Sequence, residues 1–177
     1  STSLHPQSRS RILAEHARIS LAQRGTQVAW FDCREVEFPY MDGHSAHGHE
    51  ATQALQRALG ACDAVLICSG VYNFDVSAVA KACLELGGRS WNDKTVGIAC
   101  ATGSMVSYMS HMGLAASLML DFRCVIVPRF VYATGDDFAD DRQPSMTIGS
   151  ETIRSRVTEL AETTAKLASA VAPFYGV

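Results

Sequence analysis

The chain has 177 residues, of which 47% are hydrophobic and 19% are charged, and its formal net charge is −3. A chain of this length forms about one domain, so we expect a single domain over residues 1–177. The apolar fraction excludes a disordered chain because it is sufficient to form a packed core. The weak acidity, without any basic run, argues against nucleic acids and anionic membranes as partners.

The cysteine pattern bears on the cellular compartment. Six cysteines are scattered singly, with no Cys-x-x-Cys pair, which favours free thiols in a reducing, cytoplasmic setting. Residues 95–120 contain no Asp, Glu, Lys or Arg and exceed the roughly 20 residues that span a bilayer. Their serines, threonines and glycines instead favour a buried strand, a tight loop and a buried helix. We therefore expect neither a membrane span nor a secretory signal.

Strand-like and helix-like segments alternate along the chain. The apolar runs VLIC, VGIAC and CVIV are continuous, which is typical of parallel strands covered on both faces. This alternation predicts an α/β fold with three layers and a doubly wound parallel sheet. The chain opens on a loop, so either the first strand of such a fold is absent from it or the pattern is altered. The expected strands are 27–31, 64–69, 95–101 and 124–132, and the expected helices are 8–24, 49–62, 76–87, 105–120 and 151–172.

Three loops follow places where parallel strands are expected to end, and ligands of open α/β sheets bind there. The first, 1–10, is rich in hydroxyls and leads into a helix, where it forms either a phosphate cradle or an ordinary serine cap. The second, 69–75, holds Tyr72 and Phe74, which either wall a planar ring or cover the core. The third, 101–104, is small enough for a close backbone approach, or is a plain turn.

The order of these motifs resembles the flavodoxin-like NAD(P)H-dependent FMN reductases, most closely the branch with the flavin reductase of alkanesulfonate monooxygenase systems. Residues 2–10 resemble the family's Gly-Ser-x-Arg-x-x-Ser-x-Ser/Asn loop, although His5 stands where Arg is frequent. Residues 70–85 resemble its Pro-x-Tyr-Asn signature with the following Lys and Glu. Residues 93–104 and 127–133 resemble its later elements, and the resemblance extends over about residues 1–138.

The resemblance implies a flavodoxin-like fold and an enzyme that transfers hydride from NADPH or NADH to FMN, and then to a small acceptor or a partner monooxygenase. The cofactor carries the chemistry, so we expect no catalytic side chain. The family's usual assemblies imply a homodimer or homotetramer. The implied FMN-binding residues are Ser3, His5, Ser8, Arg9 and Ser10 for the phosphate, Gly70, Val71, Tyr72, Asn73 and Phe74 for the isoalloxazine, and Ala101, Thr102, Gly103 and Ser104 for the pyrimidine edge through backbone N–H groups.

Two other function classes stay open: a flavodoxin-like electron carrier, and a family member that has lost flavin and serves as an interaction module. The histidines of residues 44–49 favour a solvated loop over a metal site, since only Glu50 offers a further ligand nearby. Residues 136–141 are expected to form a solvated acidic turn. The methionines of residues 105–119 are expected to form a buried or subunit-facing stripe.

Overall fold

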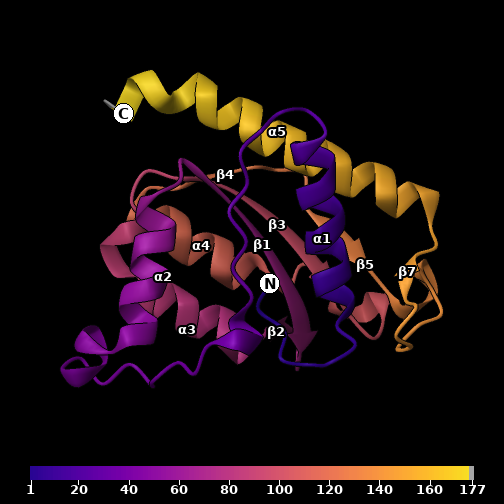
Figure 1. Cartoon of the computed structure of the whole chain (residues 1–177), viewed down its shortest axis with the longest axis horizontal. Helices are drawn as coiled ribbons and strands as arrows, with labels where there is room; N and C mark the ends of the chain where they lie inside the picture. Colours follow the sequence, from indigo (N-terminus) through magenta and orange to yellow (C-terminus); the bar gives the residue numbers. More distant parts are fainter. Residues whose placement is uncertain (176–177) are drawn as a thin grey trace.

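A mostly parallel sheet lies at the centre of the molecule, with helices on both faces (Figure 1). The structure is a computed structural model and describes residues 1–175. Strands β1 (Ala64–Tyr72) and β3 (Thr95–Ala101) run parallel in a register that pairs Ala64 with Thr95 and Gly70 with Ala101. β4 (Val125–Ile126) and β5 (Val131–Ala133) both pair parallel with β3, and β2 (Asp75–Val76) pairs antiparallel with β1. This arrangement confirms the predicted α/β class.

The helices divide between the two faces of the sheet. On one face lie α1 (Arg9–Ala22) and α5 (Glu151–Tyr175), and on the other lie α2 (Glu50–Gly60), α3 (Ala78–Gly87) and α4 (Met112–Phe122). Successive strand residues point to opposite faces: Ile98 and Cys100 join the α2–α4 cluster, while Ala99 and Ala101 join the α1–α5 cluster. All seven residues of β3 are buried, which explains its continuous apolar sequence.

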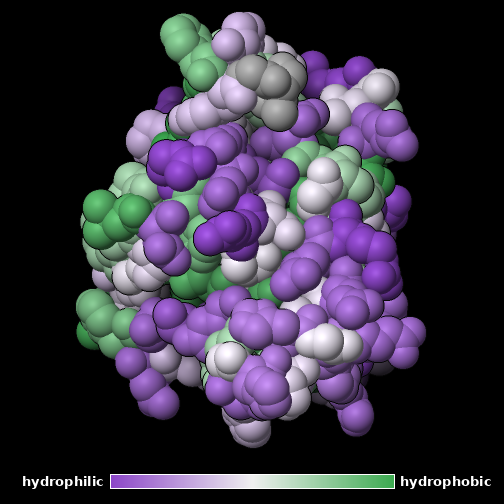
Figure 2. All heavy atoms as spheres, turned by 90° about the vertical axis from the view of Figure 1, so that its left-hand side faces the viewer, coloured by the Kyte–Doolittle hydropathy of each residue, from purple (hydrophilic) through white to green (hydrophobic). Residues whose placement is uncertain are grey.

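The outer surface on the side of α2, α3 and α4 is mostly hydrophilic. Figure 2 shows this side, with purple hydrophilic residues over most of it and smaller groups of green hydrophobic residues at its left margin, top and upper right. Among residues 1–175, no helix combines the length and apolar character that crossing a bilayer requires.

Several predicted boundaries are wrong. Residues 27–31 form no strand; backbone hydrogen bonds join their end only to Ser1, whose nitrogen donates to Phe31 O (2.9 Å) and whose carbonyl accepts from Cys33 N (3.0 Å). The helix predicted for 105–120 begins at Met112 after a short 3₁₀ turn, because Met109 has φ +72° and interrupts helical geometry. The strand predicted for 124–132 is divided into β4 and β5. The last helix continues through Pro173 to Tyr175.

Other predictions are confirmed closely. The strand expected at 95–101 is β3, and the strand expected at 64–69 is β1 with three further residues. Ser8 caps α1, as the serine-cap interpretation predicts. A short antiparallel ribbon, β6 (Phe138–Ala139) and β7 (Thr147–Ile148), precedes α5. It returns the chain to the start of α1, which matters for the site.

Candidate functional site

Three sequence-distant loops meet at the carboxyl ends of β1 and β3 and line a cleft of about 270 Å³. Of the fourteen predicted site residues, ten line this cleft; His5, Asn73, Phe74 and Ser104 do not. A wider depression of about 530 Å³ lies along α1 and α5 and is lined mostly by charged and hydroxyl side chains. The cleft at the strand ends is lined by Ser3, Ser8, Arg9, Ser10, Gly70, Val71, Tyr72, Ala101, Thr102, Gly103 and Arg142.

The first wall of the cleft is the loop that leads into α1. Ser8 Oγ accepts the Arg11 N–H (3.1 Å) as a helix cap and lies 3.1 Å from Ser10 Oγ. The N–H groups of Arg9 and Ser10 have no acceptor among the described hydrogen bonds, as expected for a first helical turn. Hydroxyls and free N–H groups at the positive end of a helix dipole form a site for an anion. The serine cap is therefore confirmed, and the phosphate cradle stays a prediction that the same loop can fulfil.

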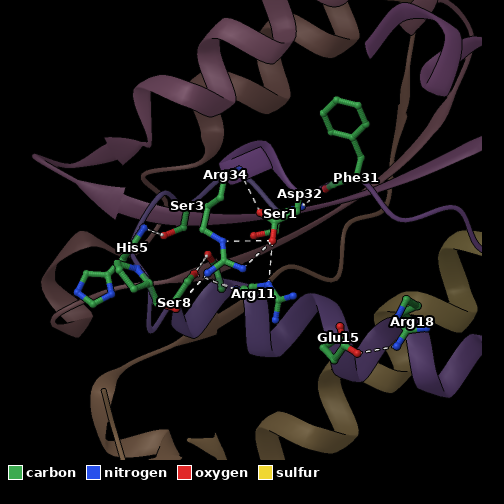
Figure 3. A network of polar contacts seen from close by, with 12 residues as sticks. Ser1, Ser3, His5, Ser8, Arg11, Glu15, Arg18, Phe31, Asp32 and Arg34 are labelled. Atoms are coloured by element: carbon green, nitrogen blue, oxygen red, sulfur yellow. Dashed lines mark hydrogen bonds and ion pairs between the residues drawn. The ribbon is translucent and has the colours of Figure 1, made fainter. Parts of the chain in front are cut away.

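A buried aspartate is hydrogen-bonded to the arginines that support this loop (Figure 3). Asp32 accepts hydrogen bonds from Arg11 Nε (2.8 Å) and from Arg34 Nε and Nη2 (3.2 and 2.9 Å). Burial opposes ionisation of Asp32, but the hydrogen bonds from Arg34 and Arg11 outweigh it, so its pKa lies below the ordinary value. Arg34 Nη1 also donates to Pro6 O (3.1 Å). This fixes the loop position relative to α1.

Arg9, predicted to hold a phosphate, is already engaged within the protein. Its Nε and Nη2 donate to the two carboxylate oxygens of Asp141, and its Nη1 donates to Thr102 O (3.0 Å). The hydrogen bond to Asp141 raises the Arg9 pKa, and the same bond lowers the Asp141 pKa. Asp141 belongs to the segment expected to be a solvated acidic turn; instead it reaches back to the first helix.

The second wall is the turn that joins β1 to β2. Tyr72 pairs with Asp75 across a two-residue loop, and both loop residues, Asn73 and Phe74, have positive φ (+50° and +64°). This is the geometry of a type I′ hairpin turn, which Asn tolerates and Phe adopts at a cost in strain. The Tyr72 ring folds back over Gly70, where an added Cβ would lie 3.1 Å from Tyr72 Cε2. Glycine at residue 70 therefore keeps an aromatic surface on the cleft.

The third wall is the turn after β3. The Thr102 N–H donates to Ala133 O (2.9 Å), and the Ser104 N–H donates to Thr102 Oγ1 (3.4 Å). Two of the backbone donors expected to meet a ligand edge are thus used inside the protein. The exposed Gly103 N–H has no acceptor among the hydrogen bonds described for residues 1–175. Gly103 is the donor this loop has left for a ligand.

Other candidates do not line the cleft. His49 caps α2 through Nδ1 (3.2 Å from Ala51 N), and within residues 1–175 no group of three His, Cys, Asp or Glu side chains is placed to hold a metal ion. His111 is fully buried against the Phe130 ring, and burial lowers its pKa. Lys81 and Glu85 pair with each other on α3. Met105, Met109, Met112 and Met119 are exposed, not buried.

Residues 1–138 match the family described as NADPH-dependent FMN reductase. The chain belongs to this family. Its members are NAD(P)H-dependent flavin reductases that use FMN and a nicotinamide cofactor, and the family resemblance of the sequence is thereby confirmed. The match ends at Phe138, before the loop that carries Asp141 and Arg142. No curated protein matches the chain.

Solved structures show the same flavodoxin-like fold. The flavoenzyme NAD(P)H:(acceptor) oxidoreductase FerB from Paracoccus denitrificans superposes with a TM-score of 0.75 at 16% identity, covering 96% of this chain and 94% of FerB. An oxidoreductase from Corynebacterium diphtheriae gives a TM-score of 0.72 at 20% identity, with 96% and 94% coverage. An NADH:FMN oxidoreductase, EMOB, gives 0.69 at 15% identity, with 94% and 86% coverage. At these identities the likeness concerns the fold.

The cleft has the donor set that FMN requires. The phosphate of FMN is a dianionic group that hydroxyls, helix N–H groups and arginine bind well. Ser3, Ser8 and Ser10 bring buried hydroxyls to one wall of the cleft. Tyr72 supplies an aromatic face beside a glycine. These residues fit a ligand with an anionic tail and a flat head.

Proposed function

We propose that this chain is an NAD(P)H-dependent FMN reductase that binds FMN in the cleft at the ends of β1 and β3. The phosphate lies on the 3–10 loop, the isoalloxazine lies beside residues 70–74, and the pyrimidine edge meets residues 101–104. The observation that carries the proposal is the convergence of these three loops on one cleft. The predicted residues outside its lining are within two positions of lining residues: His5, Asn73, Phe74 and Ser104.

Bound FMN supplies the capacity to accept hydride, and the chain's residues bind and orient the two cofactors. Tyr72 and Phe74, each more than half exposed, offer the flat surface beside which a planar ring can stack. The Gly103 N–H is available to a carbonyl oxygen of the ring. Neither NADPH nor NADH is favoured by a particular side chain in the cleft.

The test is a titration of the purified protein with FMN, followed by the addition of NADPH or NADH without oxygen. We expect saturable binding and loss of the visible flavin bands upon reduction. Ser10→Ala removes a hydroxyl from the phosphate wall and is expected to weaken FMN binding about tenfold, the effect of one hydrogen bond to a charged group. Ser20→Ala, at the other end of α1, is the matched control: Ser20 Oγ also makes a hydrogen bond within the helix, to His16 O, but Ser20 does not line the cleft.

The remaining outcomes separate the alternatives. Ser8→Ala also weakens FMN binding, but it removes the α1 cap and costs about 1 kcal/mol of stability, so Ser10→Ala is the cleaner variant. FMN binding without reduction by either nicotinamide would identify an electron carrier. Failure to bind FMN would contradict the proposal and favour an interaction module.

Finer features of the function are part of the same proposal. We infer a single flavodoxin-like domain over residues 1–177 and a cytoplasmic location, supported by six unpaired cysteines. A homodimer or homotetramer is supported by the exposed Met105, Val106, Tyr108, Met109 and Met112 beside the cleft. Light scattering measures the assembly.

The electron acceptor is inferred from the sequence motifs. Their resemblance to the flavin reductase of alkanesulfonate monooxygenase systems supports delivery of reduced FMN to a partner monooxygenase or a small acceptor. Turnover with FMN in excess, coupled to a flavin-dependent monooxygenase, tests this delivery.

A further inference from the structure

We propose that Arg142, in the loop between β6 and β7, binds the phosphate of FMN and makes the cleft select FMN over riboflavin. This inference rests on the proposed function, because it takes FMN as the ligand. Residue 142 lies outside the segment that matches the family, which ends at residue 138. The family match therefore assigns it no role.

The cationic side chains that line the cleft are Arg9 and Arg142. Arg9 is neutralised, since Asp141 accepts from its Nε and Nη2 and Thr102 O accepts from its Nη1. A phosphate monoester carries a charge of about −1.5 to −2 at pH 7. The Arg9–Asp141 pair presents almost no net charge to such a group, so the ligand's charge is left to Arg142.

Arg142 is oriented for this role. Its Nη1 donates to Gln7 O (2.6 Å), which places the guanidinium against the loop that carries the phosphate-wall serines. That bond uses one of five N–H donors and leaves Nε and Nη2 for an anion. Among the ion pairs of residues 1–175, none involves Arg142. His5 does not line the cleft, and its Nδ1 accepts the Gln7 N–H (3.0 Å).

The loop that carries Arg142 is held by its own contacts. The Arg142 N–H donates to Sδ of buried Met146 (3.4 Å), and the Gln143 N–H donates to Asp140 O (2.9 Å). Ser145 Oγ donates to Asp140 Oδ2 (2.9 Å), and Asp141 joins the loop to α1 through Arg9. Arg142 therefore extends from a preformed loop. A preorganised cation loses less entropy when it binds an anion.

The experiment compares dissociation constants for FMN and riboflavin, which differ only in the phosphate. For Arg142→Ala, we expect FMN to bind about tenfold more weakly, as for a charge-assisted hydrogen bond, with riboflavin affinity unchanged. Arg142→Lys retains the charge but not the paired N–H donors of the guanidinium. Its FMN affinity is expected to lie between those of the wild-type protein and Arg142→Ala. Added salt should weaken FMN binding to the wild-type protein more than to Arg142→Ala. Arg24→Ala is the control, since Arg24 follows the far end of α1 and pairs with Glu162.

Each outcome has one interpretation. Equal FMN affinities in the wild-type protein and Arg142→Ala would overturn the inference and leave the proposed function intact. Parallel losses for FMN and riboflavin would also overturn it, because they would show that Arg142 only supports the Gln7 loop. If the wild-type protein binds riboflavin but not FMN, the inference fails together with the proposed function, which requires FMN binding. If it binds neither flavin, the proposed function fails as well.

Discussion

The ion pair between Arg9 and Asp141 is expected to stabilise the fold in a pH-dependent manner. The side chains are 15% and 30% exposed, and both carboxylate oxygens accept from the guanidinium. Hydrogen bonds between charged groups contribute about 1.5–3 kcal/mol each when well buried, and partial exposure reduces this through solvent screening. Asp141→Asn retains one acceptor and loses the charge. We expect the free energy of unfolding to fall by about 1–2 kcal/mol at pH 7.

The sign of the pH dependence follows from the pKa of Asp141. The hydrogen bond from Arg9 lowers this pKa below its ordinary value of 3.8. The unfolded chain thus binds a proton at a pH where the native carboxylate is still charged, so the contribution is complete above pH 4 and declines as the pH falls through the native pKa. The stability difference between the wild-type protein and Asp141→Asn should therefore narrow below pH 4. Urea denaturation at pH 7 and at several acidic values measures it.

Asp93→Asn is the matched control. Asp93 accepts from Arg123 Nε and Nη2 (both 2.9 Å) with the same two-bond geometry, but the Arg123 side chain is 63% exposed. Water screens this pair more strongly, so its loss should reduce stability less than the loss of the Asp141 carboxylate. Equal stabilities of Asp141→Asn and the wild-type protein at pH 7 would refute the reasoning. A deficit that stays constant into acid would show that the damage is steric and not electrostatic.

Two further substitutions test the packing and the turn. Phe74→Gly is expected to raise the free energy of unfolding by about 1 kcal/mol, because it relieves a positive φ of +64°. The same substitution is expected to weaken FMN binding. A lower free energy of unfolding in urea denaturation would contradict the expected relief of strain. Gly97→Ala is expected to cost about 1–3 kcal/mol, because its Cβ would overlap Thr164 Oγ1 and lie 2.7 Å from Leu66 Cδ1. Gly113→Ala, at an exposed position of α4, has open space for its Cβ and should be neutral or stabilising. Equal effects of the two alanines on the denaturation midpoint would argue against the overlap.

The sequence was informative where burial alone determines structure. β3 is buried throughout, and its apolar run marked it to the residue. β1 is buried through its middle, and its run marked it except for the last three residues. Residues 27–31 carry a similar run, yet a strand also needs a neighbour along its length, and theirs is limited to Ser1. Residues 105–111 contain no Gly or Pro to mark a boundary, but a positive φ at Met109 delays the helix. Pairing partners and single backbone reversals leave no periodic signal in a sequence.

The site was predictable in its loops and not in its charges. The composition of three loops pointed to this sheet edge, and the family resemblance implied the ten of their residues that line the cleft. Asp141 and Arg142 had no such signal, because each meets the first loop across more than 130 positions of sequence. An acidic run before a helix suggested a solvated turn. Only the return of the β6–β7 ribbon toward α1 shows that one of its carboxylates neutralises Arg9.

The burial of the sheet also explains why the phosphate cation comes from so late in the chain. Every residue of β3 is buried, and a charged side chain there would have to be desolvated at a high cost. Ligand contacts must therefore come from loops beyond the strand ends. The first loop brings Arg9, but its partly buried guanidinium is stabilised by Asp141 and links the loop to the ribbon. A separate, more exposed cation can then meet the ligand without being needed for the fold, and Arg142 occupies that position.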